Sequence, residues 1–155
     1  MKTIFMAGER FEKDSISALK LVAEKLNVVA YVSEKDVPLD EIIRLCSKYT
    51  IPLYIYKNIH KAIKNKEIEQ PDIGLSYQYR RIIKEPLLSF PKNGVINFHS
   101  SPVSEQRGVG CCTYAILHGY KEWGVTSHYM DAGIDTGPVI KMKTFDISFL
   151  FTIGI

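Results

Sequence analysis

The chain has 155 residues, 46% of them hydrophobic and 24% charged, which is typical of one globular domain with a sizeable core. Its net charge of +3 is too small to indicate a nucleic-acid surface, and no apolar run approaches the roughly 20 residues that span a bilayer. We therefore expect neither a nucleic-acid nor a membrane partner. The three cysteines, two of them adjacent, predict neither a disulfide framework nor a metal site, and they favour a reducing, cytoplasmic location.

Short apolar runs alternate with amphipathic stretches through the first half of the chain. The runs predict strands at Thr3–Ala7, Val28–Val32, Pro52–Tyr56 and Asp72–Ser76. The amphipathic stretches predict three helices, one from an Asp14-Ser15 cap to Leu26, one from Pro38 to Tyr49, and one from Ile59 to Asn65 after an Asn58 cap. The segment from Tyr79 to Leu88 is also expected to be partly helical, although Pro86 interrupts it.

The second half of the chain continues the pattern with a change near its end. Val95–Phe98 predicts a buried strand and Val109–Leu117 a helix, while Trp123–Met130 and Pro138–Phe145 predict two strands joined by a short turn. Together the elements predict an α/β fold: a Rossmann-like, open, mostly parallel sheet with helices on both faces and an antiparallel strand near the C-terminal edge. We expect one domain over residues 1–146. The apolar tail 147–155 is either a closing strand or the end of a truncated chain.

Polar side chains gather where the fifth predicted strand ends. Asn97 and His99 lie two residues apart, so they share one side of this strand. In open α/β sheets, ligands bind beyond the strand ends, and an amide and an imidazole there can both donate to a developing oxyanion. The alternative is that both side chains bond only to nearby backbone groups.

A carboxylate follows in the glycine-rich turn after the next strand. Asp135 stands in Gly133-Ile134-Asp135-Thr136-Gly137, and a carboxylate beside an imidazole both orients the ring and favours its protonated form. Tight turns also use aspartate for their own hydrogen bonds, which leaves a structural role open, and Asp131 competes for the catalytic role as second choice. His60, His118 and His128 are interpreted as structural, with His128 the least secure because its strand leads to the site.

Three common motifs are missing from the chain. After the first strand stands Gly8-Glu9-Arg10-Phe11 instead of a dinucleotide-binding glycine turn. The sequence also holds neither a P-loop nor the G-x-S-x-G elbow of α/β-hydrolases. The fold class alone therefore does not indicate a function.

Four short motifs, taken in their order along the chain, resemble the signature of the folate-dependent formyltransferases. They are Asn97-Phe98-His99, Arg107-Gly108, Gly124-Val125-Thr126 and Ile134-Asp135-Thr136-Gly137. The resemblance covers Gly94 to Phe145 best. It implies a catalytic domain that passes a formyl group from the cosubstrate 10-formyltetrahydrofolate to an amine, with Asn97, His99 and Asp135 as catalytic residues.

The resemblance also implies binding residues. The folate would lie beside the backbone of Leu75, Ser76 and Tyr77 and beside a turn that contains Met130, Asp131, Gly133 and Ile134. Arg107 and Gly108 would contact the substrate. The chain departs from the family at Val103-Ser104-Glu105-Gln106, where a Leu-Pro pair is usual, so the path of this loop is open.

Within the family, the chain is most similar to the sugar-nucleotide N-formyltransferases, through Arg107–Gly110, Tyr114–Leu117 and Glu122–Thr126. This similarity implies an amino-deoxysugar on a nucleotide as acceptor. The alternatives are a methionyl-tRNA formyltransferase-like enzyme, a truncated inactive relative that only binds folate or nucleotide, and a hydrolase of the formyl-folate. The purine-pathway branch is disfavoured because the first strand lacks its glycine- and serine-rich loop. The apolar tail suggests a partner surface, and a homodimer is one such arrangement.

Overall fold

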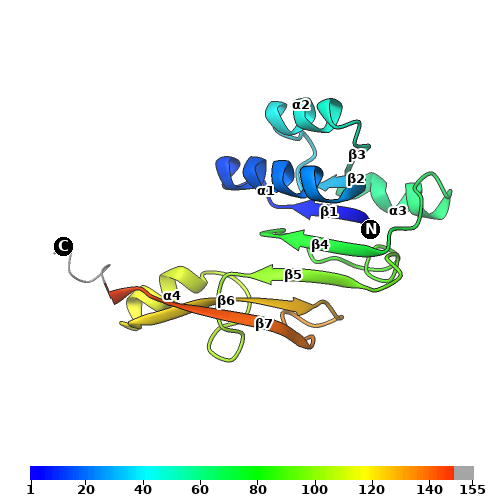
Figure 1. Cartoon of the computed structure of the whole chain (residues 1–155). Coiled ribbons are helices and arrows are strands. Elements are labelled where there is room, and N and C mark those ends of the chain that lie inside the picture. The colour runs from blue at the N-terminus through cyan, green and yellow to red at the C-terminus, as the bar shows by residue number, and fades with distance from the viewer. Residues whose placement is uncertain (149–155) are drawn as a thin grey trace. The chain divides into compact units, whose positions relative to one another are not determined.

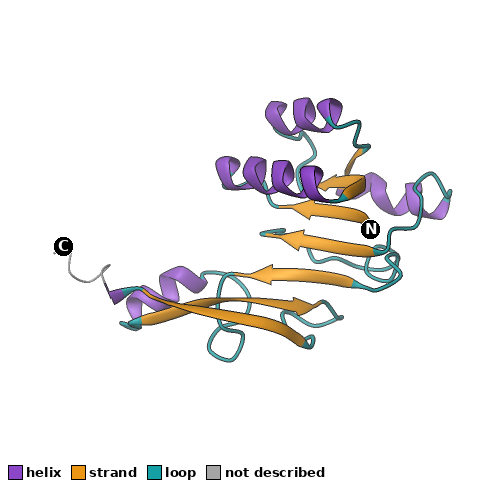
Figure 2. Cartoon of the chain, viewed as in Figure 1, coloured by secondary structure: helices purple, strands orange, loops and turns teal. Residues whose placement is uncertain are grey.

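The computed structural model of the chain describes residues 1–148, which form an α/β structure with seven strands and four helices (Figures 1 and 2). The chain divides into two compact units, Met1–Ile96 and Asn97 onward, and the boundary falls inside one strand. Strand pairing is parallel in the first unit, with an antiparallel pair in the second, as the alternation of elements predicted. Residues 149–155, most of the predicted tail, lie outside the described part.

The first unit is built on four parallel strands in the order β3-β2-β1-β4. These are β1 Lys2–Ala7, β2 Asn27–Ser33, β3 Leu53–Ile55 and β4 Ile73–Tyr77. Each lies within one or two residues of its predicted position, because continuous apolar runs of strand length are what a sheet covered on both faces requires.

Three helices cover this sheet: α1 Glu12–Lys25, α2 Asp40–Lys48 and α3 Tyr56–Lys64. α1 and α2 share one hydrophobic cluster with alternate strand residues, which holds Phe5, Tyr31, Leu19 and Ile42. Ile4 and Met6 alternate with these strand residues, so they point to the other face, and both are fully buried. α3 contacts β2 and β3 and buries Ile59 and Ala62 outside that cluster. The prediction of helices on both faces is confirmed.

The predicted helix starts are wrong by two to four residues. α2 begins at Asp40 and not at Pro38, and the last helix begins at Cys111 and not at Val109. α1 begins at Glu12, and Ser15 lies inside it, where its hydroxyl donates to the carbonyls of Gly8 and Phe11. α3 begins at Tyr56, so Asn58 is a helical residue and not a cap. Polar residues favour first turns as well as caps. In this chain, Ser15 lies inside α1 and donates its hydrogen bond back to the carbonyl of Gly8.

The predicted partial helix from Tyr79 to Leu88 is absent, and the segment is a loop with turns. Glu34 holds its beginning: the Arg80 N–H donates to Oε2 over 2.9 Å, and Arg81 Nε donates to the Glu34 carbonyl over 2.7 Å. Pro86 has no N–H to continue a helical ladder. A buried carboxylate and a proline thus override the amphipathic pattern.

The second unit carries the end of β5 (Val95–His99), the helix α4 (Cys111–Leu117), and a hairpin of β6 (Glu122–Tyr129) and β7 (Val139–Asp146). The antiparallel pairing of this hairpin confirms the predicted antiparallel strand. Phe98 is 45% exposed, so the strand expected to be buried is open at this point. Behind the hairpin, a small core joins Cys111, Ala115, Trp123 and Ile147, the first tail residue.

No helix within residues 1–148 is long and apolar enough to cross a bilayer.

Candidate active site

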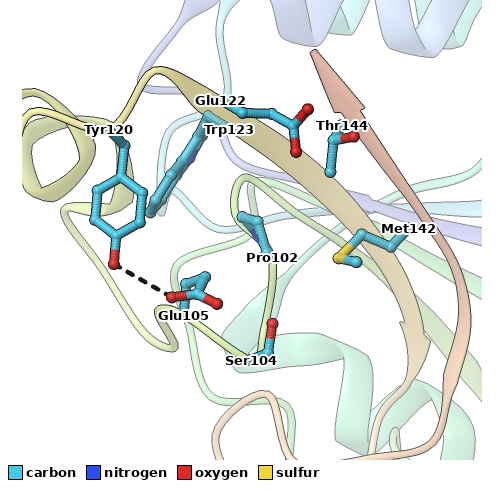
Figure 3. A pocket seen from close by; sticks show the side chains of 8 residues that line it. All are labelled: Pro102, Ser104, Glu105, Tyr120, Glu122, Trp123, Met142 and Thr144. Atoms are coloured by element: carbon cyan, nitrogen blue, oxygen red, sulfur yellow. Dashed lines mark hydrogen bonds between the residues drawn. The ribbon is translucent and has the colours of Figure 1, made fainter. Parts of the chain in front are cut away.

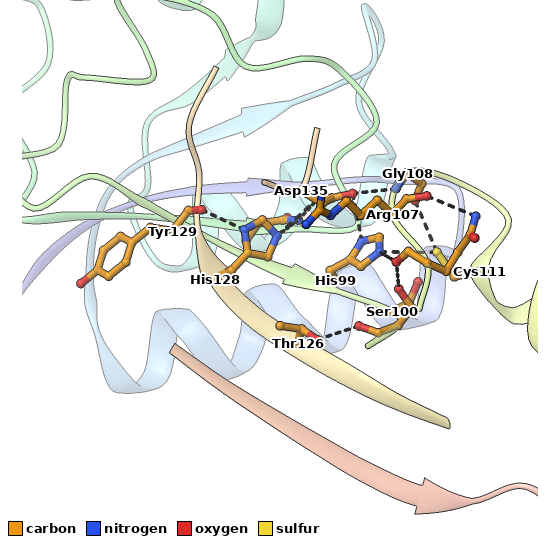
Figure 4. A network of polar contacts seen from close by, with 12 residues as sticks. His99, Ser100, Arg107, Gly108, Cys111, Thr126, His128, Tyr129 and Asp135 are labelled. Atoms are coloured by element: carbon orange, nitrogen blue, oxygen red, sulfur yellow. Dashed lines mark hydrogen bonds and ion pairs between the residues drawn. The ribbon is translucent and has the colours of Figure 1, made fainter. Parts of the chain in front are cut away.

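Asp135 is the centre of a polar network in the second unit (Figure 4). Its Oδ2 accepts the Gly108 N–H over 2.8 Å and lies 3.4 Å from His99 Nδ1. Its Oδ1 lies 3.3 Å from Asn97 Nδ2 and 3.4 Å from His128 Nε2. The side chain of Asp135 is only 13% exposed, so donors from Gly108, His99 and Asn97, together with the His128 ring, surround a largely desolvated carboxylate. Asn97 and His99 therefore both lie within contact distance of Asp135, while the roles of the three residues stay predictions.

The backbone of the turn explains how Asp135 reaches this position. Asp135 has a φ of +52°, in the left-handed region that aspartate tolerates better than most residues. Asp131 Oδ1 ties the turn together by accepting the Gly133 N–H over 2.9 Å and the Thr136 hydroxyl over 2.6 Å. These two bonds, the hydroxyl first, lower the pKa of Asp131. Asp131, which ranked second for the catalytic role, is therefore exposed and bonded within its own turn.

His99 is held from both ring nitrogens, and its side chain is 7% exposed. Nε2 lies 3.1 Å from the Gln106 carbonyl, and that carbonyl also accepts the Ser101 hydroxyl. A carbonyl cannot donate, so Nε2 must carry a proton for this contact to be attractive. Nδ1 faces the Asp135 carboxylate, and a second proton there completes the pair. The doubly protonated ring is therefore the form that satisfies both contacts.

His128 belongs to the same network, although the sequence led us to interpret it as structural. Its Nδ1 lies 2.8 Å from the Tyr129 carbonyl, which places a proton on Nδ1, and its Nε2 lies 3.3 Å from Asn97 Nδ2. A neutral ring can accept there, so the two N–H groups of Asn97 are directed at His128 and Asp135. The signal was the alternation on β6: Thr126 and His128 are buried between exposed Val125 and Tyr129. A polar side chain at an inward strand position was a cue to a polar site.

The arrangement can stabilise negative charge on a carbonyl oxygen. An amide and a protonated imidazole supply donors, and the carboxylate balances the imidazolium. The side-chain contacts to Asp135, at 3.3 to 3.4 Å, are longer than the about 2.7–2.9 Å of charge-assisted bonds. Catalytic contacts without a substrate are often long and tighten in the reacting complex.

The two residues expected to contact the substrate differ in what they offer. The N–H of Gly108 is the shortest contact of Asp135, and this glycine has a φ of +78°, which favours glycine. In the structure, the Gly108 N–H holds the carboxylate of Asp135. Arg107 beside it is exposed, so its guanidinium is available to an anionic substrate group.

The residues expected to line the folate lie partly in each unit. On β4, Leu75 and Tyr77 are half-buried and pack against the core under α1 and α2, while Ser76 is 1% exposed. The Tyr77 carbonyl accepts the Gly8 N–H over 2.9 Å. In the second unit, Met130 is half-buried, and Gly133 and Ile134 are exposed on the turn that carries Asp135. Ligand binding by either group stays a prediction.

The loop after β1, which lacks a phosphate-binding motif, contains a carboxylate where such a loop would offer N–H groups. Glu9 is 2% exposed and accepts the Leu39 N–H over 2.9 Å and the Ser33 hydroxyl over 2.5 Å. Burial, and then the charge of Glu9, raise the pKa of Tyr31, whose hydroxyl lies 3.4 Å from the same carboxylate. Two donors beside this loop, the Leu39 N–H and the Ser33 hydroxyl, are therefore already bonded to Glu9.

A shallow pocket of about 280 Å³ lies elsewhere in the second unit, against the β6–β7 hairpin (Figure 3). It is lined by Pro102, Ser104, Glu105, Tyr120, Glu122, Trp123, Met142 and Thr144. None of Asn97, His99 and Asp135 lines it, and its two carboxylates disfavour a nucleotide phosphate. The chemistry of the polar network therefore does not belong to this pocket. Within residues 1–148, no group of three or more His, Cys, Asp or Glu side chains could hold a metal ion.

Comparisons with known proteins match nearly the whole chain. The family model described as formyl transferase matches residues 1–152. A methionyl-tRNA formyltransferase from Kosmotoga olearia is 28% identical over 158 residues, which cover 96% of this chain and 50% of the relative. The chain thus spans about half the length of this relative, and methionyl-tRNA formyltransferases predominate among the similar curated proteins.

Solved structures share the fold. A phosphoribosylglycinamide formyltransferase from Bacillus halodurans superposes with a TM-score of 0.74 at 23% identity, covering 95% of this chain and 80% of the other. A sugar 3N-formyl transferase, WlaRD, solved with dTDP and 5-N-formyl-THF, has a TM-score of 0.69 at 22% identity, covering 95% and 53%. At such identities these likenesses establish the fold alone.

Proposed function

Since this chain belongs to the formyl transferase family, as its motifs indicated, we propose that it transfers a formyl group from 10-formyltetrahydrofolate to a primary amine. The observation that carries this proposal is the network in which Asn97 and His99 both contact the largely buried carboxylate of Asp135. The curated proteins similar to this chain include methionyl-tRNA formyltransferases, and one structural neighbour was solved with 5-N-formyl-THF.

The proposed reaction forms a tetrahedral oxyanion when the amine attacks the formyl carbon. The Asn97 amide and the His99 imidazolium donate hydrogen bonds to this oxygen, and each such donor stabilises a transition state by on the order of 3 kcal/mol. Asp135 balances the charge of His99. It also relays a proton from the attacking amine to the folate nitrogen that leaves, directly or through water. The bond from amine nitrogen to carbon forms, and the bond from folate nitrogen to carbon breaks.

The acceptor we favour is an amino-deoxysugar carried on a nucleotide. The residues that support this branch are Arg107–Gly110, at the edge of the network, and Glu122–Thr126, which begin β6. Exposed Arg107 suits an anionic group on such a substrate. The occupied loop at Glu9 disfavours a phosphate in the first unit, which is the feature that separates this chain from the purine-pathway branch.

Methionyl-tRNA is the second candidate acceptor. The observation in its favour is the number of methionyl-tRNA formyltransferases, at 28 to 31% identity, that match about 95% of this chain. The chain covers only about half of these relatives.

The test is an incubation of the purified chain with 10-formyltetrahydrofolate and one acceptor at a time, either a panel of dTDP-amino-sugars or charged methionyl-tRNA. Mass spectrometry of the acceptor, together with calorimetry of donor binding, gives the readouts. A formyl mass gain on a sugar supports the favoured acceptor, and a gain on methionyl-tRNA supports the second. Free formate without an acceptor would point to a hydrolase, and donor binding without turnover to a binding relative. Absence of both turnover and donor binding would refute the proposal.

A further inference from the structure

A closed circuit of contacts surrounds His99 and passes through a side chain that the proposed chemistry does not use (Figure 4). His99 Nδ1 faces Asp135 Oδ2, and the same oxygen accepts the Gly108 N–H over 2.8 Å. The Gly108 carbonyl accepts the thiol of Cys111 over 3.4 Å. The Sγ of Cys111 then lies 3.5 Å from His99 Nε2, which closes the circuit.

The protons of this circuit can be placed from its donors and acceptors. The thiol of Cys111 has one proton and donates it in a hydrogen bond to the Gly108 carbonyl, so the sulfur presents lone pairs to His99 Nε2. The Gln106 carbonyl, 3.1 Å from the same nitrogen, is also an acceptor. Nε2–H is therefore shared between an oxygen and a sulfur, and the other ring nitrogen is left for Asp135.

The position of the sulfur is fixed by packing. Cys111 is the first residue of α4, is 3% exposed, and belongs to the small core with Ala115, Trp123 and Ile147. Cys112, its neighbour on the helix, is exposed. Rotation of the imidazole about its bond to the strand would break the sulfur contact on one side and the Asp135 contact on the other.

We propose that Cys111 is a positioning residue for His99: its sulfur fixes the tilt of the imidazole and keeps a proton on Nε2. The inference rests on the proposed function, in which His99 donates to an oxyanion. Sulfur is a weak acceptor, so the ring is oriented by it and still gives up this contact to a charged oxygen at small cost.

The kinetic test compares Cys111→Ala, Cys111→Ser and Cys112→Ala. Loss of one modest hydrogen bond predicts that Cys111→Ala lowers kcat by about fivefold with KM for the donor unchanged. Cys111→Ser restores part of the rate because a hydroxyl both donates to Gly108 and accepts from His99. Cys112→Ala, the matched control from the same helical turn, keeps the wild-type rate.

A second readout needs neither donor nor acceptor. Proton–nitrogen correlation spectra of the histidine rings report which nitrogen of His99 carries a proton. Cys111→Ala is expected to shift the Nε2 signal of His99, and Cys112→Ala is expected to leave it in place. If Cys111→Ala does not fold, Cys111→Val, which fills the volume without an acceptor, carries the same expectation.

Unchanged His99 ring signals in the Cys111 variants overturn the inference, whatever the rates. Equal kinetic losses in Cys111→Ala and Cys111→Ser, with unchanged ring signals, assign Cys111 to packing alone. If the wild-type chain transfers no formyl group to any acceptor, the proposed function fails, and the ring spectra still decide whether the sulfur positions the imidazole.

Discussion

The replacement Asp135→Asn tests the centre of the site with the smallest change of shape. Asparagine also tolerates the left-handed backbone at this position, where φ is +52°. Its side-chain oxygen can keep the 2.8 Å bond from the Gly108 N–H, and its NH2 group then faces His128 Nε2, which can accept. The variant should fold, with a loss of about 1 to 3 kcal/mol in the free energy of unfolding.

The catalytic loss follows from the missing charge. The carboxylate lies 3.4 Å from His99 Nδ1, and opposite charges at that separation attract by about 5 kcal/mol at an effective dielectric constant of about 20. Part of this attraction already exists before the reaction, so only a fraction lowers the barrier. We expect kcat to fall on the order of 10²- to 10³-fold, since about 1.4 kcal/mol corresponds to a factor of ten.

The assay is the rate of tetrahydrofolate formation with the acceptor that is identified, together with calorimetry of donor binding and thermal unfolding. Asp146→Asn is the control, because that carboxylate lies at the exposed end of β7 and bonds the Ser148 N–H instead. A folded Asp135→Asn protein with kcat within about threefold of wild type would refute the reasoning, because the lost charge would then do nothing for the barrier.

Three further predictions test other parts of the structure. Burial, with a smaller effect of the Glu9 charge, raises the pKa of the Cys46 thiol from 9.0 to about 12, so its thiolate fraction at neutral pH falls about a thousandfold. Thiol labelling of the folded chain, read by mass spectrometry, should find exposed Cys112 modified and Cys46 unmodified. The Thr136 hydroxyl and the Gly133 N–H lower the pKa of Asp131, so their stabilisation of the turn is present above the ordinary pKa of 3.8 and is lost as the pH falls through the lowered pKa. Thr136→Val should move the NMR titration of the Asp131 carboxyl up toward 3.8, and an unmoved titration contradicts this prediction. Gly108→Ala places a side chain at a φ of +78°, and chemical denaturation should show a loss of about 1 kcal/mol or more together with reduced kcat, whereas unchanged stability would mean that the loop adapts without strain.

The sequence was sufficient to predict the sheet, since continuous apolar runs leave few alternatives to buried strands. It also placed Asn97 and His99 on one side of β5, because strand alternation follows from geometry alone. The sequence did not predict what surrounds the imidazole. The carbonyl of Gln106 comes from a loop whose sequence departs from the family pattern at Val103–Gln106, and the sulfur of Cys111 comes from the first residue of α4. Local rules do not fix the path of such a loop.

Some differences between the predictions and the structure come from contacts that the local sequence pattern does not show. Glu34, which follows β2, holds the backbone at Arg80 and Arg81, where the local pattern favoured a helix. His128 was interpreted as structural, and the structure brings it into contact with Asn97 and Asp135. Contacts of this kind need the fold before they can be seen.

The network predicts that its members act as a unit, and a double-mutant cycle tests this most directly. His99 Nδ1 and Asp135 Oδ2 lie 3.4 Å apart, and in the proposed reaction Asp135 acts on the barrier chiefly through the charge of His99. Once His99 is replaced by alanine, the carboxylate has no imidazolium to balance, so the further change Asp135→Asn should cost little. The double variant should therefore be about as slow as His99→Ala alone, and the two single losses should not multiply. Losses that multiply would mean that Asp135 contributes by its own route, as the proton relay, and that its pairing with His99 is incidental to the rate.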